Sequence, residues 1–212
     1  MKKYLEANAA IREALAAADE ALGNILAACG DMKIELNENR FESLVSSIVG
    51  QQLSNRVVEV IWGRVTRLTG GEITPENILN TGEEAFRQTG MSRPKIRYIK
   101  NLAEAVLSGA VELDAFDDME NKDIIQSLAA VKGIGEWTAE MFLVFSLGRE
   151  DVFSAGDGGL QRAVKKLYAL DDIPPKPRLL EISEKWKPYR TYASLYLWRS
   201  LDNMPAKADS LV

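Results

Sequence analysis

Residues 128–139 read LAAVKGIGEWTA, an apolar helix that passes through Gly-Ile-Gly directly into a second apolar helix. Gly133 and Gly135 tolerate positive φ and leave no side chain between the backbone and an approaching ligand. The second helix begins at once, so its first N–H groups are unpaired and its dipole is positive at this end. The turn therefore predicts a main-chain site for an anion such as a DNA phosphate. Ile134, at the tip of the turn, is expected to point inward and hold the two helices together.

A plain turn between helices, with glycines that only cap helix ends, is the competing interpretation of this segment. The apolar residues around it favour the hairpin: Leu128, Val131, Thr138, Ala139 and Phe142. With them, the segment resembles the helix-hairpin-helix element in the version found in the HhH-GPD superfamily of base-excision DNA glycosylases. The resemblance implies that one group of residues contacts DNA here: Lys132, Gly133, Ile134, Gly135 and Thr138. Lys132 departs from the proline that many relatives carry, which should change the rigidity of the turn and not the chemistry.

An aspartate follows the hairpin at the distance that the superfamily implies for its catalytic carboxylate. Residues 151–162 read DVFSAGDGGLQR, and the pattern Gly-Asp-x-Gly-Leu-x-Arg is similar to the alkylpurine branch of the superfamily. Asp157 takes the catalytic position, and Arg162 is expected to contact DNA. A fixed carboxylate can stabilise the oxocarbenium-like state of glycosidic cleavage and orient the attacking water. A mere N-cap of the next helix is the simpler alternative for Asp157, and Asp151, the nearest rival carboxylate, is expected to be structural.

The second position after the hairpin glycines bears on lyase activity. Superfamily members that also cut the DNA backbone carry a Schiff-base lysine there, whereas this chain has Trp137. No amine is then placed to attack the sugar C1′ carbon. The resemblance therefore implies a monofunctional enzyme without lyase activity at abasic sites.

A second segment resembles the minor-groove loop of the family. Chemistry on a stacked base requires that its nucleotide be rotated out of the duplex, and residues 48–54, IVGQQLS, lie between two expected helices. The resemblance assigns Gln52 or Leu53 as the wedge that fills the gap, with Ser54 beside them on DNA and Gln51 nearer the base pocket. Taken without the hairpin, this loop is an unremarkable turn.

Aromatic residues are expected to form the base pocket. Residues 186–198, WKPYRTYASLYLW, are similar to the closing signature of alkylpurine glycosylases, in which the terminal tryptophan lines the pocket. Trp137 and Trp198 would hold a positively charged methylated purine by cation–π attraction, and Tyr192 is a further candidate for substrate contact. Core packing is the alternative for Trp198 and for the tyrosines.

The composition excludes several kinds of site. The chain has no histidine, so imidazole triads and histidine-ligated metals are excluded, and the single Cys29 cannot hold an iron–sulfur cluster. No metal site and no organic cofactor are expected, although a monovalent cation between hairpin and phosphate would fit the family. The net charge of −5 argues mildly against nucleic acid. The distribution of charge matters more than its sum, however, because DNA meets only one face. One stretch is basic and free of acids: Arg87, Arg93, Lys95, Arg97 and Lys100.

The periodicity of apolar residues is helical along almost the whole chain, which predicts an all-α fold. Ala9–Ala28 reads as one helix, and residues 41–68 read as two helices that meet near Gly50–Ser54. Further helices are expected at 83–89, 93–107, 121–131, 136–147, 158–170, 178–186 and 189–201. The resemblance implies a single glycosylase core made of two helical subdomains, about 1–40 with 150–212 and about 41–149, with the active-site cleft between them. No apolar run reaches the roughly 18 residues of a membrane span.

The expected function follows from the hairpin, Asp157 and the aromatic residues in combination. It is hydrolysis of the N-glycosidic bond of alkylated purines, of the 3-methyladenine and 7-methylguanine type, in double-stranded DNA, which leaves an abasic site for base excision repair. A cytoplasmic, nucleoid-associated monomer is expected. A non-catalytic helix-hairpin-helix DNA-binding module is one alternative, against which Asp157 argues. A glycosylase for another damaged base is the other, although mismatch-adenine and oxidised-guanine enzymes usually carry the cluster or the lysine that this chain lacks.

Overall fold

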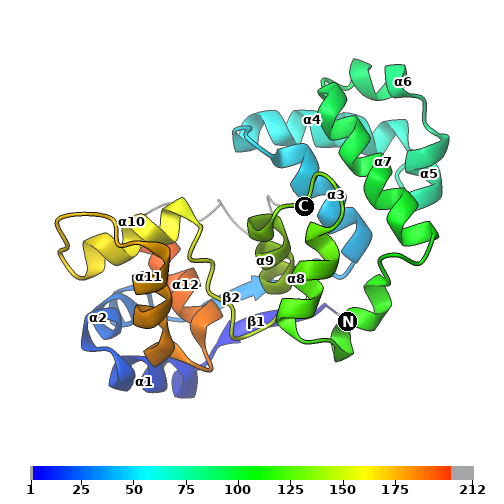
Figure 1. Ribbon diagram of the computed structural model, residues 1–212. Coiled ribbons are helices and arrows are strands. Elements are labelled where there is room, and N and C mark those ends of the chain that lie inside the picture. The colour runs from blue at the N-terminus through cyan, green and yellow to red at the C-terminus, as the bar shows by residue number, and fades with distance from the viewer. Residues whose placement is uncertain (1, 202–212) are drawn as a thin grey trace. The chain divides into compact units, whose positions relative to one another are not determined.

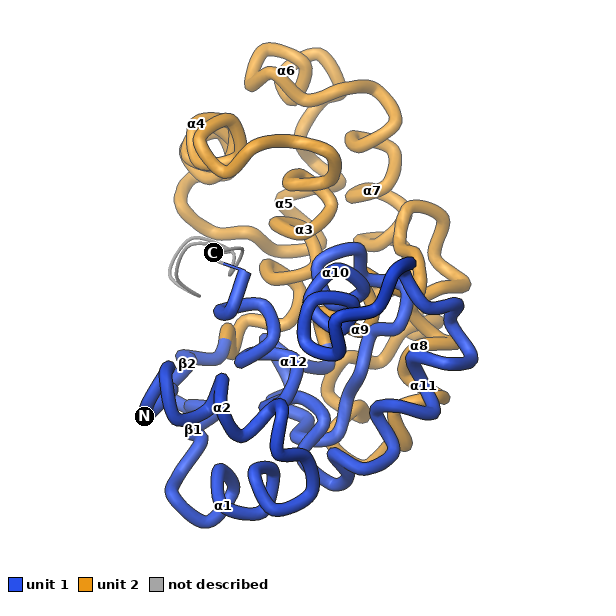
Figure 2. The backbone as a smooth tube through the Cα atoms, turned by 90° about the vertical axis from the view of Figure 1, so that its left-hand side faces the viewer, with its two compact units in different colours: residues 1–36, 143–208 blue, residues 37–142, 209–212 orange. Residues whose placement is uncertain are grey.

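A computed structural model describes residues 2–201 of the chain, and this part is mostly helical (Figure 1). The predicted all-α class is confirmed. The described residues form two compact units, the first made of residues 2–36 and 143–201 and the second of residues 37–142 (Figure 2). Within the described residues, no helix is both long and apolar enough to cross a membrane.

The first unit is built from both ends of the described chain. Its elements are β1 (Tyr4–Ala7), α1 (Ala9–Ala18), α2 (Glu20–Cys29), β2 (Met32–Glu35), α10 (Gly158–Leu167), α11 (Lys176–Ser183), the 3₁₀ turn η2 (Glu184–Trp186) and α12 (Arg190–Arg199). Helix α12 packs against α2 and α10. Every residue from Thr191 to Trp198 is buried, so α12 forms the centre of this unit. A helix that is buried on all sides is a rigid support for whatever it carries.

The second unit gathers its helices around α7. Its elements are α3 (Arg40–Gly50), α4 (Asn55–Leu68), α5 (Pro75–Asn80), α6 (Glu83–Gln88), α7 (Arg93–Leu107), η1 (Leu113–Asp118) and α8 (Asn121–Ala129). Helix α9 (Glu136–Phe145) begins in this unit and ends in the first. Helix α7 contacts α3, α5 and α6 and buries Ile96, Ile99 and Leu102 among them. This pattern of i, i+3 and i+6 is the apolar stripe expected of an amphipathic helix.

Several helix boundaries agree with the sequence. Helices α3 and α4 meet at residues 51–54, as predicted for residues 41–68. Helix α5 begins with the Thr74 side chain capping Asn77 N and with Pro75 in its first turn. Helix α7 spans the residues that the periodicity predicted. These starts are determined locally, since an N-cap acts over three residues and proline fits only the first turn of a helix.

The prediction of one helix over Ala9–Ala28 is wrong. The chain forms α1 and α2, and Asp19 separates them with an extended backbone at φ −154° and ψ 100°. The Asp19 side chain caps α2 at Leu22 N, and its backbone N–H closes α1 on Leu15 O. Because the apolar spacing continues through this break, periodicity alone cannot show it. The cause of the break lies elsewhere in the unit.

Asp19 is the buried centre of a polar cluster, with 6% of its surface exposed. Its Oδ2 accepts hydrogen bonds from the Tyr168 hydroxyl and from Trp186 Nε1 (2.8 Å), and it forms an ion pair with Lys185 Nζ at 3.1 Å. Burial by itself raises the pKa of the Asp19 carboxyl, but the hydrogen bonds that it accepts outweigh burial and hold that pKa below its ordinary value. These donors hold the Asp19 carboxylate in one position. The helical backbone is therefore interrupted at residue 19.

The helical periodicity of the sequence also gave no sign of two short strands, β1 and β2. β1 and β2 pair antiparallel with Leu5 opposite Ile34 and Ala7 opposite Met32, and all four of these side chains are buried. Each strand has only four residues. Alternation over so few residues carries little signal, and the pairing joins segments on either side of two helices.

Replacing Asp19 with alanine is expected to lower the free energy of unfolding at about pH 7 by roughly 3 kcal/mol, because buried donors lose their acceptor. Since the folded-state pKa is lowered, this contribution is present above the ordinary carboxyl range and lost as the pH falls through the lowered value. The gap between wild type and variant should therefore close as the pH falls from about 7 toward 3. Urea unfolding across this range measures it.

Asp31→Ala is the matched control for this experiment, because Asp31 forms an ion pair with Arg12 while its own side chain is 84% exposed. Its loss should cost less than about 1 kcal/mol. A gap between wild type and Asp19→Ala that is the same at every pH would contradict the role assigned to the ionised carboxylate.

Candidate active site

Asp157 caps the N-terminus of α10, as its position in the sequence predicted. Its Oδ1 accepts a hydrogen bond from Leu160 N at 2.7 Å and a second from Trp198 Nε1 at 2.9 Å. The side chain is partly exposed. The carboxylate is thus held by the first turn of one helix and the last turn of another, both in the first unit. Two donors on one oxygen fix the direction of the group and place its negative charge at the positive end of α10.

Trp198 is a buried residue, with 5% of its surface exposed. Its ring stacks on Phe145 from the end of α9, with ring centroids 6.1 Å apart and planes inclined by 26°. The stacked pair directs the indole N–H at Asp157. The structure therefore shows a contact to the carboxylate that the sequence did not indicate. A direct contact of Trp198 with substrate stays a prediction.

Gly159 leaves the room that this hydrogen bond needs. A Cβ at this position would lie 2.9 Å from Asp157 Oδ1 and 3.1 Å from Trp198 Nε1. Real Cβ atoms essentially never come as close as 2.9 Å to another atom, and 3.1 Å is already tight, so a side chain at residue 159 would require the carboxylate or the indole to shift. Sequence reasoning missed this requirement. The doubled glycine at 158–159 was the available signal, but its cause depends on Trp198, far along the chain.

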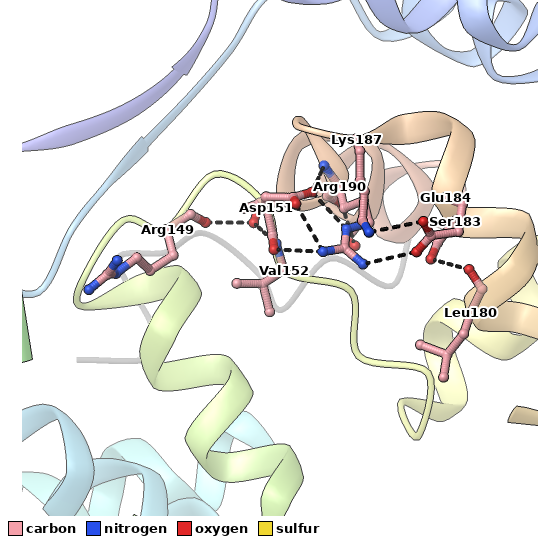
Figure 3. Close-up of polar contacts among 10 residues, drawn as sticks. Arg149, Asp151, Val152, Leu180, Ser183, Glu184, Lys187 and Arg190 are labelled. Atoms are coloured by element: carbon pink, nitrogen blue, oxygen red, sulfur yellow. Dashed lines mark hydrogen bonds and ion pairs between the residues drawn. The ribbon is translucent and has the colours of Figure 1, made fainter. Parts of the chain in front are cut away.

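The loop that leads to Asp157 is fastened to the start of α12. The Arg190 guanidinium binds the Asp151 carboxylate through two hydrogen bonds, Nε to Oδ1 at 2.6 Å and Nη2 to Oδ2 at 2.9 Å, and it reaches Glu184 at 3.8 Å on its other side (Figure 3). The Thr191 hydroxyl donates to Arg149 O at 2.6 Å and accepts from Val152 N at 3.0 Å. The loop is therefore held at one end of α12, while Trp198 holds Asp157 at the other.

Two predicted roles can be compared with this clamp. Asp151 was expected to be structural, and its bidentate pairing with Arg190 agrees with that expectation. Tyr192, a predicted substrate contact, is 2% exposed and donates its hydroxyl to Glu150 Oε1 at 2.6 Å. Burial and this hydrogen bond raise the pKa of the Tyr192 hydroxyl well above its ordinary value. Its predicted substrate contact remains untested.

Of the two hairpin glycines that could adopt a positive φ, Gly133 does so and Gly135 does not. Gly133 adopts φ +113°, which is costly for any residue with a side chain, and a Cβ there would lie 2.2 Å from the Tyr98 ring. Ile134 is buried with 4% exposure, so it points inward as expected, and Thr138 is buried as well. Lys132 and Gly135 are exposed. The two residues on the outside of the turn are thus available to a ligand, and DNA contact by the group stays a prediction.

The loop between α3 and α4 presents its predicted wedge residues to the outside. Gln52 is exposed and adopts a positive φ of 57°, and Leu53 is 37% exposed. Ser54, the N-cap residue of α4, is exposed too. Gln51 is half-buried, and its side-chain amide donates to Gly133 O at 2.9 Å. This bond joins the loop to the hairpin within the second unit.

The remaining predicted residues lie at the starts of two helices. Trp137, in the first turn of α9, is 47% exposed, an unusual state for so large an apolar side chain. Arg162 is exposed on α10, one turn beyond Asp157. Among the described residues, no group of three or more histidines, cysteines, aspartates and glutamates could hold a metal ion. The group that the structure holds in a fixed position is the carboxylate of Asp157.

Comparison with known proteins places this geometry in context. A family model described as HhH-GPD superfamily base excision DNA repair protein matches residues 45–188. The chain is 36% identical over 163 residues to DNA-3-methyladenine glycosylase 1 of Schizosaccharomyces pombe. The aligned region covers 76% of this chain and 72% of that protein. A crystal structure of DNA-3-methyladenine glycosidase from Bacillus halodurans matches with a TM-score of 0.84 at 39% identity, over 99% of this chain and 98% of that one. The S. pombe 3-methyladenine DNA glycosylase in complex with abasic DNA matches with a TM-score of 0.81 at 32% identity, over 91% and 97%.

Gly159→Ala is expected to separate Trp198 from Asp157 and to destabilise the protein by about 1–3 kcal/mol through overpacking. The indole N–H resonance of Trp198 in an NMR spectrum should shift as its hydrogen bond weakens. Gly63→Ala is the matched control, because Gly63 lies within α4 with no atom within 4 Å of an added Cβ. An unshifted resonance together with unchanged thermal stability in Gly159→Ala would show that the site tolerates a side chain there.

Proposed function

The chain belongs to the HhH-GPD superfamily of base excision DNA repair proteins, and on this premise we propose that it is a DNA glycosylase for alkylated purines. It hydrolyses the N-glycosidic bond of bases of the 3-methyladenine and 7-methylguanine type in duplex DNA and leaves an abasic site. The relatives named as 3-methyladenine glycosylases support this proposal.

The observation that carries the proposal is the Asp157 carboxylate. It lies at the N-terminus of α10, partly exposed, with Oδ1 held by Leu160 N and Trp198 Nε1. A carboxylate that served only as a helix cap would need only the first of these bonds. The second bond, together with the glycine that makes room for it, argues for a group whose position matters beyond the stability of α10.

Such a carboxylate suits a reaction in which positive charge moves to the sugar. When the bond between C1′ and the alkylated purine breaks, its electron pair leaves with the purine, which becomes neutral, and the sugar becomes oxocarbenium-like. Asp157 stabilises this charge electrostatically, and no reorganisation is needed because its donors already hold it. Water then adds to C1′ and gives up a proton to Asp157 or to solvent. The product is the free base and an abasic deoxyribose.

Substrate preference follows from the limited acid chemistry of the site. The chain has no histidine to protonate a neutral leaving base. Alkylation at N3 or N7 replaces that step, because the base already carries positive charge before the bond breaks. The exposed Trp137 would attract such a cation through its ring face. We therefore place cationic alkylpurines above neutral lesions as substrates.

DNA contact is assigned to the predicted residues that lie exposed. The hairpin would hold a phosphate through its main chain, with Lys132 beside it, and the loop at Gln52 and Leu53 would fill the space of the extruded base. Because Trp137 stands where a Schiff-base lysine would be required, the reaction ends at the abasic site without lyase cleavage. The enzyme acts as a monomer on duplex DNA and needs no cofactor; a monovalent cation between hairpin and phosphate would be compatible.

Asp157→Asn is expected to lower single-turnover base release by at least about a thousandfold, because the amide keeps the shape of the side chain but not the charge that stabilises the sugar cation. Affinity for DNA should be equal or higher, since a negative charge near phosphates is removed. Asp123→Asn, an exposed acid in the first turn of α8, is the control and should be unaffected. Excision near the wild-type rate by Asp157→Asn would refute the assignment, and binding without excision by the wild type would indicate a non-catalytic DNA-binding module.

Wild-type enzyme is expected to release 3-methyladenine and 7-methylguanine faster than neutral hypoxanthine, and to release neither 8-oxoguanine nor uracil usefully. Single-turnover rates on matched duplexes measure this order. In the same assays, strands should break only after hot alkali, because the enzyme leaves abasic sites uncut. Uracil or 8-oxoguanine as the best substrate would overturn the specificity, and strand breaks without alkali would overturn the absence of lyase activity.

A further inference from the structure

Lys95, in the first turn of α7, lies beneath the loop that joins α3 to α4. Its Nζ donates to Val49 O at 2.7 Å and to Gln51 O at 2.6 Å. These carbonyls belong to the last turn of α3 and to its C-cap residue, where main-chain acceptors lack partners within the helix and the dipole is negative. The ammonium group thus closes the end of α3 at the point where the loop begins.

The half-buried position of the Lys95 ammonium group costs free energy, because the charge loses part of its contact with water. The side chain is half-buried, and burial lowers the pKa of its ammonium group. Both hydrogen-bond partners are main-chain carbonyls, and neither is a carboxylate that would offset the loss of solvent. A charge held in this way constrains the backbone that it binds. The backbone in question is that of the α3–α4 loop.

The loop itself needs such a constraint. Gln52 adopts a φ of +57°, a conformation that residues other than glycine rarely occupy and that persists only where neighbouring contacts enforce it. A tight turn from Leu53 N to Gly50 O (3.1 Å) accompanies it. Gln52 and Leu53 both remain exposed as a result. The contacts that enforce this shape are made by Gln51, through its carbonyl to Lys95 and its side chain to Gly133 O.

The same face of α7 also supports the hairpin. Tyr98, one turn after Lys95, occupies the space that a side chain at Gly133 would need. Asn101, a further turn along, donates from Nδ2 to Lys132 O at 3.2 Å. Residues three apart on a helix lie on one face. One face of α7 therefore holds the main chain of both segments that the proposed function brings to DNA.

We infer that Lys95 is a positioning residue that fixes the α3–α4 loop in the conformation needed to take the place of an extruded base. The inference rests on the proposed function. Lys95 acts through the carbonyls of Val49 and Gln51 and not through a DNA phosphate, because its ammonium is already engaged by them. Loss of the ammonium should then impair extrusion of a paired base while leaving the chemistry at Asp157 intact.

Lys95→Met tests this inference, with Lys100→Met as the matched control. Lys100 lies on the same helix and also donates to a main-chain carbonyl, Thr81 O at 2.9 Å, which belongs to the segment between α5 and α6. Excision from a fully paired alkylated duplex should fall by about tenfold or more in Lys95→Met, but by less than about threefold when the lesion lies opposite an abasic site, since an unpaired base leaves the stack more easily. Lys100→Met should affect both substrates equally. A purely destabilising effect of Lys95→Met would also lower both rates together, which would overturn the inference.

Hydrogen exchange of the Leu53 amide is a second readout that does not depend on catalysis. Its exchange should speed up in Lys95→Met and not in Lys100→Met, because the turn to Gly50 O loses its support. Unchanged exchange together with equal rates on the two substrates would overturn the inference, while an inactive wild type would overturn the proposed function instead. If Lys95→Met does not fold, Lys95→Gln, which keeps one donor group, enters the same comparisons.

Discussion

The hydrogen bond from Trp198 Nε1 to Asp157 Oδ1 is the contact on which the candidate site depends. A carboxylate at the start of a helix is fixed along one direction by its own backbone, here by Leu160 N. The indole supplies a second direction from a different helix. Because Trp198 is buried and stacked on Phe145, its N–H cannot turn away without disturbing the core. The position of the charge is thus tied to the packing of the first unit.

Several buried or half-buried polar interactions help to maintain the packing of the first unit, although burying polar groups is costly. Asp151 with Arg190 and Glu150 with Tyr192 fasten the loop before Asp157 to the first turn of α12. Asp19 lies inside the same unit and accepts a hydrogen bond from the hydroxyl of Tyr168, which is the C-cap residue of α10, the helix that Asp157 caps at its start. Replacing such pairs by apolar residues often stabilises proteins, so their presence is weak evidence for stability. Their value here is that they orient α10 and α12, which apolar contacts alone would do less specifically.

In the second unit, the side chains that support the loop and the hairpin bind main-chain carbonyls. Lys95, Asn101 and Gln51 all donate to backbone carbonyls, and Gly133 leaves space for the Tyr98 ring. A main-chain surface can meet a phosphate on any sequence, because every residue offers the same N–H group. The shape of such a surface has to be held by side chains packed beneath it, since strained positions such as Gln52 relax when these contacts are lost. The burial of Ile134 contributes to the same end from within the hairpin.

Local sequence patterns were enough to predict the helical class, the bounds of helices such as α7, the tight turn at Gly133 and the capping position of Asp157. Each follows from local rules, namely apolar spacing along a helix, the freedom of glycine, and caps that act over three residues. Tertiary contacts, by contrast, set the partner of Trp198, the break at Asp19, the pairing of β1 with β2 and the contacts of Lys95. The Asp19 bond to Trp186 joins residues 167 positions apart, and that of Lys95 to Val49 joins residues 46 apart. Periodicity within a window of a few turns does not show which distant side chain will make a contact, because that depends on how the helices pack against one another.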